Sequence, residues 1–442
     1  MRALVRLLAA ALCLAGAAPA AAGPVLLVSL DGLRPGDVAE ATARGMTLPN
    51  LSALAAEGAS AQGVVGVLPT LTYPSHTTLV TGVAPAEHGV GNNLTFDPLQ
   101  TNQTGWYWYA SDVRVPTLWQ AAKAAGLTTA NVHWPVTVGA PGIDRNLPQI
   151  WRTGSEDDRK LLAALATPGL VARLEATVGE RYAQGIDETV EGDANRVRFA
   201  AALLAADKPQ FMTVYLAGID HAEHQAGPGS AGAKAAIAAT NALVGQLVRA
   251  ARAAMPDVTV VVVSDHGFHA VTTDVNLVRP FVEAGLVTLD AAGKITGWEA
   301  EPWLAGGTAA IRLARPDDAA LVARVKALLD RLARDPAYHI AAVLDRAAVA
   351  KAGGATEASF FVALEPGYET GRDPAAPVTQ PSSYKGMHGY MPGDPAMRST
   401  LIVAGPGIRH RDLGVVDMRA IAPSIARVLG ANMPSAMVKP VF

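Results

Sequence analysis

A threonine at the start of a predicted helix is the residue in this sequence best placed to do chemistry. Within the stretch Leu68–Asn93, Thr72 comes just before a predicted helix in which Pro74 suits the first turn and Gly82 the carboxyl end. Backbone N–H groups at a helix N-terminus attract anions such as phosphate. A threonine hydroxyl there is a candidate nucleophile once a base or a metal ionises it. The alternative is a hydroxyl-rich, capped helix without catalytic chemistry.

Residues that could activate this threonine follow predicted strands, and one more lies in a Gly-flanked loop. Aspartate and histidine suit Zn²⁺ or a similar divalent ion, and the chain has only ten histidines. The candidate donors are Asp31, Thr72, Asp220, His224, Asp265, His266 and His388. Such a set is large enough for two ions, the usual arrangement for in-line displacement at phosphorus. Each segment alone also has a structural explanation, because an aspartate such as Asp31 commonly caps a turn.

Buried strands that alternate with helices must position these donors. Continuous apolar runs predict strands at Pro24–Leu30, Phe211–Leu216 and Val258–Val263, each followed by donors. Helices are expected between the strands, the longest at Ala231–Ala254. The alternation predicts an α/β fold with a doubly wound, mostly parallel central sheet and helices on both faces. Ligands of such folds bind at the carboxyl ends of the strands, where these donors lie.

The segment 286–381 differs from the rest of the chain. It carries glycine and proline breaks, a charged helix and short apolar runs. We interpret it as a cap subdomain inserted into a main domain that covers residues 23–442. Such a cap is expected to shape the choice of substrate.

The composition indicates which partners to expect, and the N-terminal residues indicate the compartment. The 442 residues are half hydrophobic and carry a formal net charge of −3, so stable nucleic-acid binding is not expected. Residues 1–22 combine a basic start, a short apolar run and a small-residue cleavage site. This pattern predicts a signal peptide, and hence a periplasmic or secreted protein without a membrane span after processing; an uncleaved anchor is the alternative. Cys13 lies in the apolar run, so the mature chain would contain no disulfide.

Together the motifs resemble those of the alkaline phosphatase superfamily, in its type I nucleotide pyrophosphatase/phosphodiesterase branch. The resemblance spans about Val25 to Gly430. It rests on Ser29–Gly32, Thr72–His76, His88-Gly89 with Asn93, Asp220-x-x-x-His224, Ser264–Gly267 and Met387–Gly389. It implies an alkaline-phosphatase-like fold and a metal-dependent hydrolase that acts on phosphodiester or phosphoanhydride bonds of small substrates such as nucleotides.

The resemblance also implies a role for each residue. The implied ligands are Asp220, His224 and His388 for one Zn²⁺, and Asp31, Thr72, Asp265 and His266 for the other. Thr72 would form a phospho-threonine intermediate, and Asn93 would donate a hydrogen bond to a phosphoryl oxygen. His76 and His88 are expected to brace the nucleophile helix rather than bind metal, and His221 to stay outside the ligand set.

The sequence favours a diester over a monoester substrate. Monoesterases of the superfamily place Lys or Arg near the metals, and the corresponding segment His133–Gly139 has neither. Tyr73 and Trp134, with Trp106 or Trp108, are the predicted stacking surfaces for the organic group. A phosphomonoesterase and a non-catalytic metal- or phosphate-binding protein are the alternatives. The sequence leaves open the leaving group (nucleotide, lipid headgroup or alkyl ester) and the oligomeric state.

Overall fold

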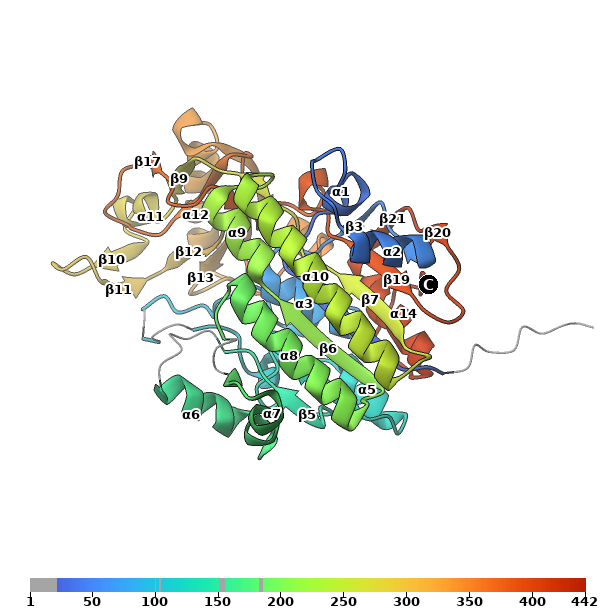
Figure 1. The fold of residues 1–442 in the computed structure, drawn as a ribbon. Helices are drawn as coiled ribbons and strands as arrows, with labels where there is room; N and C mark the ends of the chain where they lie inside the picture. Colours follow the sequence, from blue (N-terminus) through green and yellow to red (C-terminus); the bar gives the residue numbers. More distant parts are fainter. Residues whose placement is uncertain (1–21, 100, 103–104, 151–155, 183–185) are drawn as a thin grey trace, which may run out of the picture.

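The computed structural model describes residues 22–99, 101–102, 105–150, 156–182 and 186–442 (Figure 1). The predicted signal peptide therefore lies, except for its last residue, outside the described residues. In the described part no single helix is long and apolar enough to cross a membrane, although α6 (Glu156–Leu165) and α7 (Leu170–Val178) pass that test as a pair bent by 118°.

An eight-stranded sheet forms the centre of the molecule. Its strands follow the order β20 (Arg411–Asp412), β2 (Ala59–Ser60), β19 (Leu401–Ala404), β7 (Thr259–Val263), β1 (Val25–Leu30), β6 (Phe211–Leu216), β4 (Thr129–Val132) and β5 (Arg145–Leu147). The strands from β7 to β5 are mutually parallel, whereas β19 is antiparallel to both of its neighbours. This topology confirms the predicted doubly wound, mostly parallel sheet.

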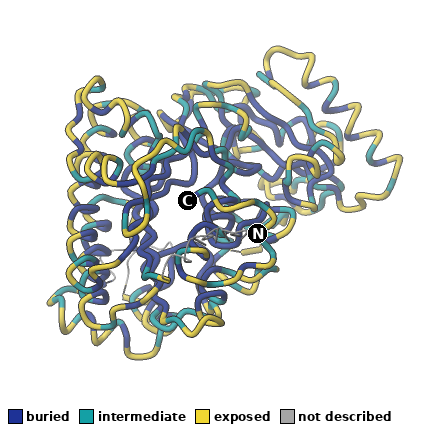
Figure 2. Tube along the Cα trace, turned by 90° about the vertical axis from the view of Figure 1, so that its right-hand side faces the viewer, coloured by how far each residue is buried: buried dark blue, intermediate teal, exposed yellow. Residues whose placement is uncertain are grey.

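Helices cover both faces of this sheet, which explains why its central strands are apolar throughout. All six residues of β1 are buried, with Leu26 and Val28 in one hydrophobic cluster and Val25 and Leu27 in another. The first cluster includes α2 (Pro49–Glu57), α8 (Val190–Asp207) and α10 (Ala231–Ala254); the second includes α3 (Thr72–Thr81), α5 (Leu118–Ala124) and α14 (Ile421–Leu429). Figure 1 shows α8 and α10 lying across one face of β6 and β7, and Figure 2 shows buried chain gathered inside an exposed outer layer.

A smaller layer is built mainly from the segment 286–381. Its four-stranded antiparallel sheet has the order β12 (Ala300–Ala305), β13 (Thr308–Leu313), β15 (Phe360–Leu364) and β14 (Ile340–Asp345), and α12 (Ala319–Leu332) packs into the same core. A second sheet pairs β9 (Thr273–Asn276) with β16 (Tyr368–Gly371) and β17 (Thr379–Pro381). The cap subdomain stays a prediction, and β9 places one strand of this layer before residue 286.

The remaining elements are short and connect these layers. They are α1 (Pro35–Ala39), α4 (Pro85–His88), α9 (Gly218–Ala226), α11 (Arg279–Glu283), α13 (Arg346–Lys351), β3 (Gly63–Val65), β8 (His269–Ala270), β10 (Val287–Leu289), β11 (Ile295–Trp298), β18 (Gly386–Met387) and β21 (Val415–Asp417). Among them, α9 and β18 matter for the site, because α9 follows β6 and β18 delivers the chain to His388.

Candidate metal centre

The predicted donors meet at the carboxyl edge of the central sheet. Asp31 follows the last residue of β1, and Asp265 and His266 follow β7 after one intervening residue. Because β1 and β7 are parallel neighbours, their carboxyl ends lie side by side. The helix α9 follows β6 on the other side of β1 and carries Asp220 and His224. The fold therefore brings together residues that are distant in sequence.

The first group of donors is fully enclosed. Ligand atoms of Asp31, Asp265 and His266 all lie within 4.8 Å of one another. His266 Nε2 is 3.3 Å from Asp31 Oδ1 and 3.1 Å from Asp265 Oδ2. All three residues are buried. The three side chains are arranged as a compact set around one point.

The second group adjoins the first and shares a histidine with it. Ligand atoms of Asp220, His266 and His388 also lie within 4.8 Å of one another, and the two imidazole rings stack with centroids 3.6 Å apart. Asp220 is 3.4 Å from His224 Nε2 and 3.6 Å from His388 Nε2. The structure thus brings all six predicted Asp and His donors together, with His266 between the two groups rather than in one of them alone.

The three imidazoles all present the same nitrogen to the carboxylates. In each ring Nδ1 faces a backbone carbonyl: that of Gly386 for His224, of Gly267 for His266 and of Thr70 for His388. A proton on Nδ1 that is donated to a carbonyl leaves Nε2 as a lone-pair ligand, as metal-binding histidines require.

The ionisable groups of the centre lack the counter-charge that burial demands. Burial raises the pKa of Asp31, and the Asp265 charge raises it further. Burial also raises the pKa of Asp220 well above its usual value, and it raises the pKa of Asp265 to about 7. Burial lowers the pKa of His224 to about 4 and that of His266 well below its usual value. Among the described residues, Oδ1 of Asp31, Oδ1 of Asp220 and Oδ2 of Asp265 are buried without a hydrogen-bond partner. Orphaned carboxylate oxygens beside neutral imidazoles fit a divalent cation such as Zn²⁺.

Thr72 lies at this centre. It is the first residue of α3, and its Oγ1 is 3.4 Å from His266 Nε2. The next backbone N–H, that of Tyr73, donates to Asn93 Oδ1 over 2.9 Å. The structure therefore places the predicted nucleophile, its helix N-terminus and the Asn93 amide against the donors.

Two buried histidines hold α3 in place, as expected from the sequence. His76 Nδ1 donates to the Thr72 carbonyl and its Nε2 accepts from Ser29 Oγ, both over 2.8 Å. His88 Nδ1 accepts from the Val90 N–H, so its Nε2 donates to Thr78 Oγ1 at 3.1 Å. Burial lowers the pKa of both histidines to about 3, which keeps them neutral. His221, half-exposed, faces Glu188 at 3.5 Å and stays outside the donor set.

A buried ion pair on α8 positions the helix that carries Asp220. The Asp193 carboxylate accepts from the backbone N–H groups of Ala217 and Gly218 at 2.9 and 2.8 Å, where α9 begins. The guanidinium of Arg196, also fully buried, pairs with the same carboxylate. A Cβ on Gly218 would come within 2.8 Å of Asp193 Oδ2, so only glycine lets the carboxylate approach this closely. Sequence reasoning missed Asp193, since nothing local marks a helix residue as a cap for a different helix.

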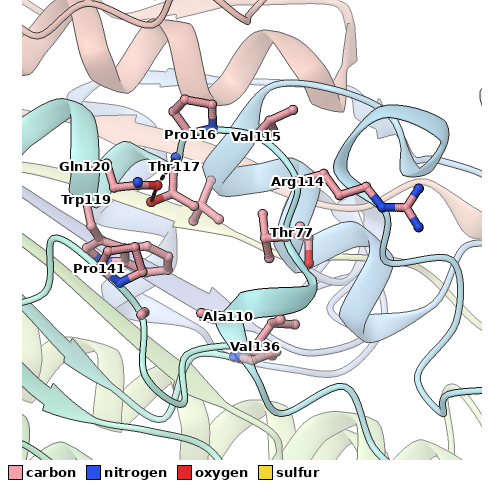
Figure 3. Close-up of a pocket in the computed structure, with 14 residues that line it drawn as sticks. Thr77, Ala110, Arg114, Val115, Pro116, Thr117, Trp119, Gln120, Val136 and Pro141 are labelled. Carbon is pink, nitrogen blue, oxygen red and sulfur yellow. Dashed lines mark hydrogen bonds between the residues drawn. The ribbon is translucent and has the colours of Figure 1, made fainter.

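A cavity of about 540 Å³ opens onto the centre. Its lining includes Asp31, Thr72, Asn93, Asp220, His224 and His388 together with Trp106, Tyr215, Arg372 and Tyr384. Another cavity, of about 270 Å³, touches Thr77 and Val80 of α3 and is shown in Figure 3. Its lining contains no carboxylate or imidazole, so it lacks the groups for metal or acid–base chemistry.

The structure corrects one of the predicted stacking surfaces. Trp134 is fully buried and does not line the cavity; its indole N–H donates to the His76 carbonyl, and its ring meets that of His76 edge-on. Tyr73 does line the cavity, although it is buried, and its ring lies 5.3 Å from that of Trp106, which is half-buried in the same wall. Core packing encloses the Trp134 ring, which a pattern of aromatic residues does not reveal.

The structure adds a tyrosine that the sequence did not single out. Tyr215 is the penultimate residue of β6, and its hydroxyl donates to Asp31 Oδ2. This bond engages one carboxylate oxygen and leaves the other directed at His266. The signal was present as an aromatic residue near a strand end, but that position is common for ordinary core residues.

Comparison with known proteins assigns the chain to a family. The model of type I phosphodiesterase/nucleotide pyrophosphatase matches residues 25–391. This chain belongs to that family. Ectonucleotide pyrophosphatase/phosphodiesterase family member 3 of Mus musculus is 27% identical over 267 residues, which are 57% of this chain and 25% of the mouse protein. An uncharacterized pyrophosphatase/phosphodiesterase of Schizosaccharomyces pombe is 26% identical over 58% of this chain and 46% of its own length.

Solved structures of family members share the fold. Human ectonucleotide pyrophosphatase/phosphodiesterase 5 superposes with a TM-score of 0.66 at 18% identity, covering 94% of this chain and 96% of that one. The murine protein, as an inactive variant in complex with AMP, gives a TM-score of 0.65 over 93% of this chain and 96% of its own. These superpositions confirm the predicted alkaline-phosphatase-like architecture. In the sequence comparison, the segment that matches this chain spans only 25% of the length of the mouse family member 3.

The buried His88 predicts an acid-sensitive fold. Its pKa is about 3 in the folded protein and about 6.5 when exposed, so between these values the unfolded chain binds the proton and stability falls as pH falls. We expect His88→Gln to reduce the loss of unfolding free energy between pH 7 and pH 4 by roughly 3 kcal/mol, measured by urea denaturation at each pH. The exposed His410→Gln serves as control and should keep the wild-type slope. Parallel slopes for all three proteins would contradict the prediction.

The Asp193 contacts predict a link between α8 and metal affinity. In Asp193→Asn the amide retains one acceptor oxygen but loses the charge that pairs with Arg196, at a cost of about 3–5 kcal/mol of stability. We expect weaker Zn²⁺ binding in calorimetric titration of the folded protein at low temperature, because α9 is less well fixed. Glu191→Gln, an exposed neutralisation on the same helix, should change neither quantity. Unaltered Zn²⁺ affinity in folded Asp193→Asn would show that the pair serves stability alone.

Proposed function

We propose that this protein is a metal-dependent phosphodiesterase and nucleotide pyrophosphatase acting on small phosphodiester or phosphoanhydride substrates. The observation that carries the proposal is the position of Thr72 Oγ1, 3.4 Å from the histidine nitrogen that the two donor groups share. Family membership supports the reaction class. The AMP complex of the murine structural relative supports a nucleotide as ligand.

Two Zn²⁺ ions are the proposed cofactors, although other divalent ions satisfy the same donors. The proposed ligands are Asp31, Thr72, Asp220, His224, Asp265, His266 and His388, whose Asp and His side chains gather as described. When bound, the ions would supply Lewis-acid stabilisation of the threonine alkoxide and of the leaving oxygen. The orphaned carboxylate oxygens support this proposal, since a cation would satisfy each of them.

The residues of the chain divide the reaction between them. Thr72 Oγ1 forms a bond to phosphorus as the bond to the leaving oxygen breaks, giving a phospho-threonine. Water then attacks that phosphorus, restoring the threonine and releasing the second product. Asn93 Oδ1 is engaged by the Tyr73 N–H, so the N–H₂ end of its amide is the donor for a phosphoryl oxygen. Trp106 is the proposed surface for the organic group of the substrate.

Two further segments, residues 1–22 and 286–381, support proposals about the location of the protein and the role of its cap. The signal-like residues 1–22 support a periplasmic or secreted enzyme. The segment 286–381 supplies part of the cavity wall through Leu304–Gly306 and Glu369–Asp373, which supports its role as a cap over the main domain 23–442. A phosphomonoesterase is the competing activity, and hydrolysis rates of bis-p-nitrophenyl phosphate and p-nitrophenyl phosphate separate the two.

Removing the nucleophile tests the proposed chemistry. Thr72→Ala deletes the side-chain oxygen assigned to attack the substrate phosphorus, so we expect turnover of bis-p-nitrophenyl phosphate to fall by about 10³-fold or more with the fold intact. Thr296→Ala, an exposed deletion of the same hydroxyl, should keep wild-type turnover. Residual turnover within tenfold of wild type in Thr72→Ala would rule out the phospho-threonine route, whereas an inactive wild-type protein would favour a binding role.

Metal removal tests the cofactor assignment without relying on activity. A chelator should lower the melting temperature, because the closely spaced carboxylates of the centre lose their counter-charge, and added Zn²⁺ should restore it. Differential scanning calorimetry and metal analysis give the readout, with two ions per chain expected. In Asp220→Asn the chelator-induced shift should shrink. A melting temperature indifferent to chelator and to Zn²⁺ would refute the metal centre.

A further inference from the structure

Apart from histidines, the described lining of the cavity at the candidate metal centre contains one basic side chain. Among the described residues that line it, Arg372 is the one arginine and there is no lysine. Six carboxylates share the lining, two of them in the candidate centre and four outside it. The two are Asp31 and Asp220, and the four are Glu188, Asp274, Glu369 and Asp373. An arginine in such surroundings would ordinarily be engaged by one of the acids.

Each outer acid is instead engaged by another partner. Glu188 faces His221, Asp274 accepts from Gln380, Glu369 accepts from Ser382, and Asp373 accepts from the backbone N–H of Ala375. Among the described residues no hydrogen bond or ion pair engages the guanidinium of Arg372, although its charge opposes the rise that burial causes in the pKa of Glu369. Arg372 is exposed, directly after the last residue of β16. Because Arg372 lines the cavity, its N–H donors are available there to an anionic group.

Arg372 also marks the place where this cavity meets a second one. A neighbouring cavity of about 570 Å³ shares Leu94, Leu304 and Arg372 with the first. Beyond these residues its walls include the rings of Phe96 and Trp303. The indole N–H of Trp303 donates to the Leu94 carbonyl at 2.9 Å, which fixes this wall to the junction. The two cavities therefore adjoin at Arg372, so a ligand held at Thr72 that extended into the second cavity would reach it beside this residue.

We propose that Arg372 binds a second phosphate group, in the leaving half of the substrate, and that the adjoining cavity receives the organic group attached to that phosphate. A planar guanidinium pairs with a phosphate through two parallel, charge-assisted hydrogen bonds. The inference rests on the proposed function and adds a residue that would select, among its substrates, phosphoanhydrides whose leaving half carries a phosphate. A simple diester has no charged group for Arg372 to hold.

The reaction balances with water as the only co-substrate. The Thr72 oxygen bonds to one phosphorus while the bridging P–O bond breaks, and the bridging oxygen leaves with its electron pair as part of a phosphate monoester. This leaving monoester is the group that pairs with Arg372. Water then cleaves the phospho-threonine, so one dinucleoside diphosphate and one water yield two nucleoside monophosphates.

The test compares leaving groups in matched arginine variants. Arg372→Gln removes the charge, Arg372→Lys keeps it without the planar fork, and Arg409→Gln neutralises an exposed arginine in a different cavity. The substrates are diadenosine diphosphate and the p-nitrophenyl ester of thymidine 5′-monophosphate, whose leaving group carries no phosphate. For Arg372→Gln we expect kcat/KM on the dinucleotide to fall by about 10- to 100-fold, as for one lost charge-assisted pair, with the ester unchanged. Arg372→Lys should be intermediate, and Arg409→Gln should equal wild type on both substrates.

Three results would overturn the inference, and a separate result would overturn the function beneath it. Equal losses on both substrates would mean that Arg372 supports the centre in general. Unchanged kcat/KM on the dinucleotide would mean that the guanidinium faces solvent during catalysis. A loss confined to p-nitrophenyl phosphate, assayed as a third substrate, would assign the guanidinium to a monoester dianion. If wild-type protein loaded with Zn²⁺ cleaves none of these compounds, the proposed function fails rather than the role of Arg372.

Discussion

The mutual repulsion of three aspartates is the constraint around which this protein is built. Asp31, Asp220 and Asp265 end up close together and enclosed because three neighbouring strands of a parallel sheet stop at the same edge. Burial and mutual charge both oppose their ionisation, which is why the pKa values of all three are raised. Such an arrangement persists only when the surrounding fold is rigid enough to hold it, and it creates a strong affinity for positive charge.

The supporting elements supply that rigidity through neutral and paired groups. His76 joins the start of α3 to β1 through Ser29, so the nucleophile helix and the strand that carries Asp31 move together. The Asp193–Arg196 pair does the same for α9 from a different helix. None of these groups adds charge to the centre itself. Catalytic preorganisation here depends on hydrogen bonds that begin outside the ligand set.

Sequence reasoning reached the fold and the donors because both depend on local signals. Apolar runs such as Val258–Val263 mark buried strands, and polar residues directly after them mark the ligand-binding edge. It failed where the answer depends on packing between distant segments. Trp134 has the composition of a stacking surface but lies in the core, whereas Arg372 lies 300 positions after Thr72 and meets its cavity only in the folded chain. A capping carboxylate such as Asp193 is equally silent in sequence, since its partner is the backbone of another helix.

The pairing of β9 with β16 fixes the position of Arg372 relative to the candidate metal centre. β9 begins seven residues after His266, and its parallel ladder with β16 ends at Gly371, the residue before the unpaired guanidinium. A hydrogen-bonded ladder is stiff compared with a loop, so strand pairing fixes the separation between the imidazole and the guanidinium. An insertion within β9 or β16 would change that separation, and with it the length of a ligand that could contact both groups, without altering either side chain.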